Sequence, residues 1–272
     1  MKNLFALASI GLAAFIAVSS EVNAEESAKN NKLTDNEMIA LKSLLSEDAK
    51  LNFEGDDSLF NYGYIPVSAK EMFKVYAANE VRGDKTYKNK KVIISGVVEK
   101  ISSSIGDVPV VSLETGDNFR TVNLSFAKKY QDIAIDLNKN QKITFACVGD
   151  TVVMGMPSVS DCKPVDIAIQ EVVNNKIADS NKALNDPKSV DDKSIFVSLV
   201  MARAVGIVTD NFKSCKPDDI NCMFEKISAM PKEKGDFQTL MRKTAKDMGV
   251  ELPGNDKNNR KYIVGLSRRI QP

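Results

Sequence analysis

The chain has 272 residues, of which 43% are hydrophobic, and its 37 lysines and arginines nearly balance its 36 aspartates and glutamates, leaving a formal net charge of +1. A near-neutral protein is not drawn electrostatically to nucleic acid or to an anionic membrane surface. The chain contains no histidine, which excludes histidine-based catalytic triads, imidazole general bases and histidine-ligated metal sites. The sequence shows no motif for other hydrolytic chemistry, so we expect no enzyme activity; a hydrolase that works without histidine is the alternative.

Residues 1–24 have the features of a cleavable export signal. Residues 4–18 form an uncharged, mostly apolar run, and residues 22–24 form a small-residue cleavage site. The run is too short for a membrane span, and a retained N-terminal anchor is the alternative. The first cysteine is Cys147, so no cysteine near the cleavage site could carry a lipid. We expect a periplasmic or secreted protein that begins near Glu25 and has no transmembrane segment.

The four cysteines agree with export, because exported chains oxidise such residues in pairs. Of the three pairings, we favour Cys147 with Cys162 and Cys215 with Cys222, since each pair is local and falls in a different region. The alternative is a metal site made of all four. Their spacing lacks the short C-x2–4-C knuckles of zinc sites, so we expect no metal and no other cofactor.

Residues 25–67 contain one predicted helix followed by a loop. Residues 25–32 are polar and predict disorder. Thr34 and Glu37 form a capping box. The helix that follows has an apolar stripe, made of Met38, Leu41, Leu44, Leu45 and Leu51. We expect this stripe to be buried in the core, with a partner-binding helix as the alternative. Residues 53–66 predict a loop that contains three aromatic side chains, Phe60, Tyr62 and Tyr64. These side chains either pack on a domain surface or line a pocket.

Residues 68–164 predict a small barrel. Ser68 begins a helix through a second capping box, with Glu71, and we expect this helix to end at residues 79–84. Gly96 lies in the middle of the first strand, where glycine allows one long strand to join two sheets. The expected strands cover residues 91–101, 108–113, 119–126 and 141–148, and a fifth begins at 151, is interrupted at Pro157 and resumes near Cys162; a short helix covers 127–137. This order is that of an OB-fold, and an open α+β meander is the alternative. We therefore predict an α+β protein with an OB-fold-like five-stranded barrel, N-terminal helices and a C-terminal helical region.

The same stretch contains an Asn-Glu helix end, a Tyr-Lys-x-Lys segment before the first strand, a glycine-centred strand, and a late glycine and cysteine. These features comprise Tyr76, Asn79, Glu80, Asp84, Tyr87, Lys90, residues 94–98, Ile101, Gly149 and Cys162. In them the chain resembles the tRNA-anti-like OB-fold family of exported bacterial proteins. It departs from many members by lacking a lipid-anchoring cysteine, and Arg82-Gly83 replaces a small, alanine-rich pair. The resemblance implies the fold and little about activity.

A nucleic-acid-binding OB-fold presents stacking aromatic side chains and a basic groove on its second and third strands. Here that surface contains a single aromatic residue, and residues 88–164 hold ten lysines and arginines against eight aspartates and glutamates. This composition disfavours a strong electrostatic interaction with nucleic acid. The candidate binding face on the third strand consists of Phe119, Arg120, Thr121 and Asn123.

Residues 165–272 predict a bundle of helices. A first helix covers residues 165–184, Asp191 or Asp192 caps a second, Asp218 caps a third, and Gly235-Asp236 precedes a fourth. The last sixteen residues, after Asp256, contain basic side chains and no acid. We interpret them as a solvated end, with a phosphate-binding patch as the alternative.

Taken together, these patterns predict an exported, non-enzymatic binding or interaction protein. We expect its partner to be a protein or a small molecule of the cell envelope. The alternatives are a single-stranded nucleic-acid binder and an inhibitor or immunity-type protein acting on an envelope enzyme.

Overall fold

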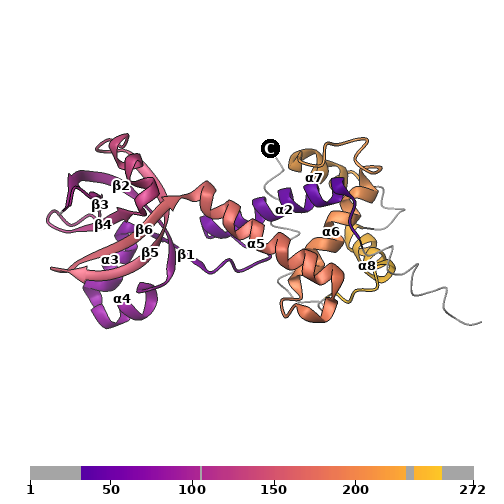
Figure 1. Ribbon diagram of the computed structural model, residues 1–272, viewed down its shortest axis with the longest axis horizontal. Coiled ribbons are helices and arrows are strands. Elements are labelled where there is room, and N and C mark those ends of the chain that lie inside the picture. Colours follow the sequence, from indigo (N-terminus) through magenta and orange to yellow (C-terminus); the bar gives the residue numbers. More distant parts are fainter. Residues whose placement is uncertain (1–31, 105, 231–235, 253–272) are drawn as a thin grey trace, which may run out of the picture.

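The structure, a computed structural model, describes residues 32–104, 106–230 and 236–252. The predicted signal peptide, the polar segment up to residue 31 and the basic tail lie outside these residues. Figure 1 shows an elongated molecule with a strand-rich body at one end and a helical body at the other. Each body has its own hydrophobic core, and a few barrel residues, among them Ile93 and Ala146, belong to the core of the helical body.

Five strands form the barrel: β2 (Lys91–Ser103), β3 (Pro109–Glu114), β4 (Thr121–Phe126), β5 (Lys142–Val153) and β6 (Met156–Pro164). The strands pair in the order β2-β3-β4-β6-β5, and β5 pairs again with β2, which closes the ring. The β4–β6 pairing is parallel and the others are antiparallel. The 3-10 helix η1 (Lys128–Ile135) lies between β4 and β5. The predicted OB-fold is therefore confirmed, and the open meander is excluded.

Gly96 has the predicted role in the long strand β2. It pairs with Ile143 of β5, and two residues later Val98 pairs with Leu113 of β3, just before a bulge. A Cβ atom on Gly96 would lie 3.0 Å from Leu113 Cδ1. The glycine thus lets β2 bend between its two partners while the interior remains tightly packed.

Both predicted disulfides are present. Cys147–Cys162 joins β5 to β6 inside the barrel, with both residues buried, and Cys215–Cys222 joins a loop to α7 (Ile220–Ser228). Cys147 lies in the middle of β5 rather than at its end. Because the barrel is closed, the first bridge is a link within the core and does not cover an open edge.

Two strand predictions are wrong. Residues 53–66 are not entirely loop, because β1 (Tyr64–Ser68) starts within them and pairs in parallel with the first half of β2. The fifth strand does not start at Thr151: β5 continues to Val153, the chain turns at Met154-Gly155, and Pro157 is the second residue of β6. Proline is tolerated near the start of a strand, and the left-handed backbone of Met154 and Gly155 makes the tight turn.

The helix before the barrel, α3 (Ala69–Ala78), ends at Asn79, within the predicted range. The prediction missed a second helix, because Asn79 also caps α4 (Glu80–Tyr87), which continues through Gly83 and Asp84. Gly83 lies within α4, where a Cβ atom would be 2.2 Å from the Tyr76 ring. The glycine is therefore needed for packing and does not act as a helix terminator. The Ser68–Glu71 capping box is present as predicted.

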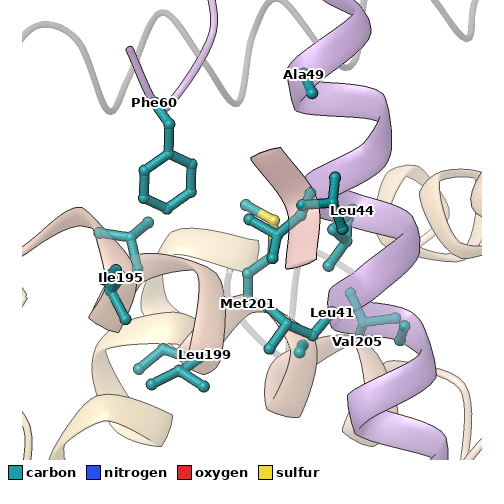
Figure 2. Close-up of a cluster of buried hydrophobic side chains, with 14 of the residues drawn as sticks. Leu41, Leu44, Ala49, Phe60, Ile195, Leu199, Met201 and Val205 are labelled. Carbon is teal, nitrogen blue, oxygen red and sulfur yellow. The ribbon is translucent and has the colours of Figure 1, made fainter. Parts of the chain in front are cut away.

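The helical body combines both ends of the described chain. It contains α2 (Asp35–Glu54), α5 (Val165–Asn185), α6 (Ser194–Val208), α7, α8 (Phe237–Asp247) and the short 3-10 helix η2 (Pro187–Ser189). Figure 2 shows Leu41 and Leu44 of α2 near Met201 and Val205 of α6 in one apolar cluster. The leucines of the predicted stripe are thus buried in the core, while Met38 is partly buried at its margin.

The helix caps agree only in part with the predictions. The Thr34–Glu37 box is present, and Asp236 caps α8. The third helix of the C-terminal region is capped by Asp219 and not by Asp218. The N-cap residue of α6 is Lys193. Asp192, one residue before the N-cap, accepts a hydrogen bond from the backbone N–H of Ser194. Where two aspartates are adjacent in the sequence, either one fits the capping pattern. The sequence alone therefore does not fix which of the two is the N-cap.

The aromatic loop packs against the core and does not line a pocket. Phe60, Tyr62 and Tyr64 are buried, and Phe53 contacts both tyrosine rings. The buried Asp48 carboxylate of α2 accepts hydrogen bonds from the backbone of Leu59 and Phe60 and from the Tyr62 hydroxyl. These bonds hold the loop against α2.

Candidate functional site

The outer face of β3, β4 and β6 is lined by small, uncharged polar side chains. Asn123 Oδ1 accepts hydrogen bonds from the hydroxyls of Ser112 (2.9 Å) and Thr121 (3.0 Å). In the strand register, Ser112 lies opposite Asn123, which lies opposite Ser158 of β6. The structure therefore brings Thr121 and Asn123 together as predicted, but their polar atoms bond one another and their neighbours.

The end of this face is formed by two turns that lie side by side. Arg120, after the β3–β4 turn, extends over Gly155 of the β5–β6 turn, where an added Cβ atom would be 2.8 Å from the guanidinium Nη1. Thr121 Oγ1 also lies 3.7 Å from Met156 Sδ across the same seam. Arg120 forms no salt bridge with the described residues. Its charge is thus available at this end of the barrel.

Exposed apolar side chains lie at the same two turns as this arginine. Phe119 is 91% exposed, Met154 is 88% exposed and Val153 is 56% exposed. We call these three residues and Arg120 the hairpin-end patch. Phe119 and Arg120 were predicted from the sequence, whereas Val153 and Met154 were missed because they fall within the predicted fifth strand. The glycine at position 155, which is typical of a tight turn, was the sequence signal that could have placed them at the end of a hairpin.

The β3–β4 turn is held in one conformation by its own hydrogen bonds. Thr115 donates from its hydroxyl to the carbonyl oxygen of Arg120 (2.6 Å), and Asp117 Oδ1 accepts from the N–H of Phe119 (2.9 Å). The exposed ring of Phe119 is consequently carried by an ordered turn. A surface ordered before binding loses less entropy when a partner binds.

The described part of the chain contains no group of three or more histidine, cysteine, aspartate or glutamate residues that could hold a metal ion. Within it, no helix has the length and hydropathy required to cross a membrane.

Comparison with known proteins places the chain in a family. The profile of the tRNA_anti-like family matches residues 2–163, which is more than half of the sequence. The chain belongs to the tRNA_anti-like family. The resemblance found in the sequence is therefore confirmed.

More distant comparisons add little to this assignment. One crystal structure, a lipoprotein of Klebsiella pneumoniae subsp. pneumoniae MGH 78578 to which nucleic-acid binding is provisionally ascribed, matches with 15% identity and a TM-score of 0.31. The match covers 36% of this chain and 89% of the lipoprotein. A comparison with curated proteins finds no match.

Several residues shared with the tRNA_anti-like pattern form a packing corner beside the barrel. The rings of Tyr76 and Tyr87 lie 6.1 Å apart, and Asn79 Oδ1 accepts a hydrogen bond from the N–H of Arg82. Burial, with a further contribution from Asp84, raises the pKa of Tyr76 to about 12. The tyrosine therefore stays protonated at neutral pH and can donate to the Asp84 carboxylate. These residues stabilise the fold, and they lie apart from the hairpin-end patch.

Proposed function

We propose that this tRNA_anti-like protein is an exported, non-enzymatic binding protein that contacts a protein partner of the cell envelope through the hairpin-end patch. The observation that carries the proposal is that Phe119, Met154 and Val153 are all exposed at two adjacent turns, which the Arg120 guanidinium brings together by lying over Gly155. Aromatic residues, methionine and arginine are enriched in protein–protein interfaces, and exposed apolar groups gathered on one surface are typical of such sites.

Export is supported by two independent features. Residues 1–24 have the pattern of a cleavable signal, and all four cysteines are paired in disulfides, which persist in oxidising compartments. N-terminal sequencing of protein released by osmotic shock is expected to begin near Glu25. Thiol titration of the same denatured but unreduced sample should find no free thiol. A full-length protein retained in the cytoplasm would contradict the export part of the proposal.

The binding part can be tested by photocrosslinking in cells. A photoreactive phenylalanine analogue placed at position 119 is expected to give a discrete protein adduct. The same analogue at Val81, which is 79% exposed on α4, is the matched control and should give no such adduct. A double substitution, Arg120→Ser with Met154→Ser, should remove the adduct formed at position 119.

The crosslinking result also decides between the proposed partner class and its alternative. A discrete adduct that proteases digest and nucleases leave intact supports a protein partner. An adduct that nuclease digests would instead identify single-stranded nucleic acid as the partner of the patch, with Phe119 stacking on a base. The same adducts at positions 119 and 81 would refute a role for the patch.

A further inference from the structure

The two disulfides differ in how open they are to solvent. Cys147 and Cys162 are 2% and 0% exposed inside the barrel, out of reach of another protein. Cys215–Cys222 belongs to the helical body, away from the barrel (Figure 1), and Cys222 is only partly buried. Exposed disulfides are the ones that exchange readily with external thiols. Between the two bridges, Cys215–Cys222 is therefore the one that a redox partner can reach.

This bridge ties a short loop to the helical core. Cys215 and Cys222 are separated by 7 positions, against 15 for the barrel disulfide. A shorter loop constrains the unfolded chain less, so stabilisation of the whole protein is a weaker reason for this bridge. Cys222 lies in the first turn of α7, where its N–H donates to the Asp219 carboxylate, and α7 packs against α2 and α6.

The chain just before the bridge has an unfavourable backbone conformation. Asp210, Asn211 and Phe212 are consecutive residues with φ values of 50°, 53° and 64°. None of them is glycine, and in this left-handed region the Cβ atom of a side chain crowds the following carbonyl oxygen. Residues other than glycine visit the region singly and rarely in succession. Such a turn persists only where the surrounding structure holds it.

The turn is held at both of its ends. At the first end lies Thr209, which is fully buried. Its hydroxyl donates to the carbonyl oxygen of Val205 and accepts from the N–H of Phe212, and its carbonyl oxygen accepts from the N–H of Ser214. At the second end, the residue after Ser214 is Cys215, which the disulfide fixes to α7. Opening the bridge leaves the turn anchored on one side only.

The turn places the Phe212 ring beside a buried carboxylate of α2. A Cβ atom added to Gly206 would lie 3.3 Å from both Phe212 Cε2 and Glu37 Oε1, so the ring and the carboxylate meet over this glycine. Glu37 pairs with Arg203, whose Nη2 also donates to the carbonyl oxygen of Lys32. Movement of Phe212 would let water reach the ion pair that ties the start of α2 to α6.

We propose that Cys215–Cys222 is a redox switch operated by a dithiol oxidoreductase of the cell envelope. A thiolate of that partner attacks Sγ of Cys222, the more exposed cysteine. The disulfide bond breaks, and Cys215 leaves as a thiolate that takes up a proton. The second thiol of the partner then loses its proton and attacks the mixed disulfide, which releases Cys222 as a thiol. The partner departs as a disulfide, so this chain gains two electrons and two protons.

Reduction changes the conformation of the loop before α7. With the bridge open, the left-handed turn relaxes and Phe212 moves away from Gly206. The Glu37–Arg203 ion pair then becomes accessible to water. The oxidised form, which the structure contains, is the resting state.

The first test measures which disulfide is reduced in the native full-length mature protein. The protein is incubated with reduced thioredoxin, quenched in acid and alkylated, and its cysteine-containing peptides are analysed by mass spectrometry. Cys215 and Cys222 should be alkylated together, at least about ten-fold faster than Cys147 and Cys162. A thioredoxin whose resolving cysteine is replaced by serine should be trapped as a mixed disulfide on Cys222. Equal rates for the two disulfides, or no reduction of Cys215–Cys222, would overturn the proposal.

The second test measures the opening of the turn by amide hydrogen exchange. Reduction by thioredoxin should raise the exchange rates of Phe212 and Ser214, whose N–H groups donate to Thr209, by at least about ten-fold. The amide of Val111, a buried residue of β3, is the control and should not change. Reduction that leaves the exchange of Phe212 and Ser214 unchanged would show that the bridge does not hold the turn, and the switch would be refuted.

A variant separates loss of the bridge from other effects of the reductant. The double substitution Cys215→Ser with Cys222→Ser should give fast exchange at Phe212 and Ser214 without any reductant, and thioredoxin should not change it further. Slow exchange in this variant would contradict the proposal. The partner class rests on the proposed export, but all these measurements use purified protein. Their outcome therefore depends neither on export nor on the hairpin-end patch, which the crosslinking experiment tests separately.

Discussion

Gly149→Ala should strongly destabilise the barrel, because the added methyl group has no space. A Cβ atom at position 149 would lie 2.0 Å from the backbone carbonyl oxygen of Tyr87 and 2.7 Å from its carbonyl carbon. Backbone atoms cannot rotate away as a flexible side chain can. The methyl group can be accommodated only if the Tyr87–Lys90 segment moves away from β5.

That movement breaks specific hydrogen bonds. The N–H of Gly149 donates to Lys90 O, and the N–H of Asn89 donates to Gly149 O, both at 2.8 Å. Overpacking a well-packed site costs about 1–3 kcal/mol, and each lost hydrogen bond about 0.5–1.5 kcal/mol. We expect the free energy of unfolding to fall by about 3–4 kcal/mol.

Urea unfolding followed by circular dichroism measures this change. Gly63→Ala is the matched control, because its Cβ atom would contact nothing within 4 Å while its φ of +75° is unfavourable for alanine. That variant should lose about 1 kcal/mol through backbone conformation alone. The steric reasoning would be refuted if the free energy of unfolding of Gly149→Ala were less than about 1 kcal/mol below that of the wild type, or if this variant were no less stable than the control.

Three further predictions concern the other stabilising contacts. Replacing Cys147 and Cys162 together by alanine should lower the unfolding free energy by about 3 kcal/mol, because the bridge spans 15 residues; an unchanged urea midpoint would contradict this. Arg203→Ala leaves the buried Glu37 carboxylate without the Arg203 Nε contact at 2.6 Å and should cost about 2–3 kcal/mol; adding Glu37→Gln should recover part of the loss, and no recovery would argue against the ion pair. The folded-state pKa of Tyr76, about 12, exceeds the value of about 10 for an unfolded tyrosine. The contribution of Tyr76 to the free energy of unfolding is therefore fully present below about pH 10 and is lost as the pH rises toward about 12. Tyr76→Phe should reduce this alkaline loss of stability, and an alkaline unfolding midpoint identical to that of the wild type would disprove the assignment.

Local sequence patterns were sufficient to predict much of the barrel. Alternating apolar residues, the glycine in the first strand and the turn near Gly116 predict β2, β3 and β4 closely, since strand periodicity depends on near neighbours. The capping box at Ser68 begins α3 at the predicted residue. The short strand β1 was missed because five residues containing Pro66 resemble a loop until a neighbouring strand provides hydrogen-bond partners.

The candidate site was only half predictable. Phe119 and Arg120 were identified from their position after a predicted turn. Val153 and Met154 belong to a hairpin more than thirty residues away in the sequence, and the parallel pairing of β4 with β6 brings the two turns together. No local pattern contains that pairing.

The sequence by itself predicted the class of fold, favoured the disulfide pairing that the structure contains and located several helix starts, because caps, strand periodicity and local cysteine spacing act over short stretches of chain. Tertiary structure decided that α2 joins α5 and α6 in one core and that β5 closes the ring against β2. It also decided that two turns form one patch. These features depend on contacts between residues far apart in the sequence, where burial of apolar surface and close backbone approach select the arrangement.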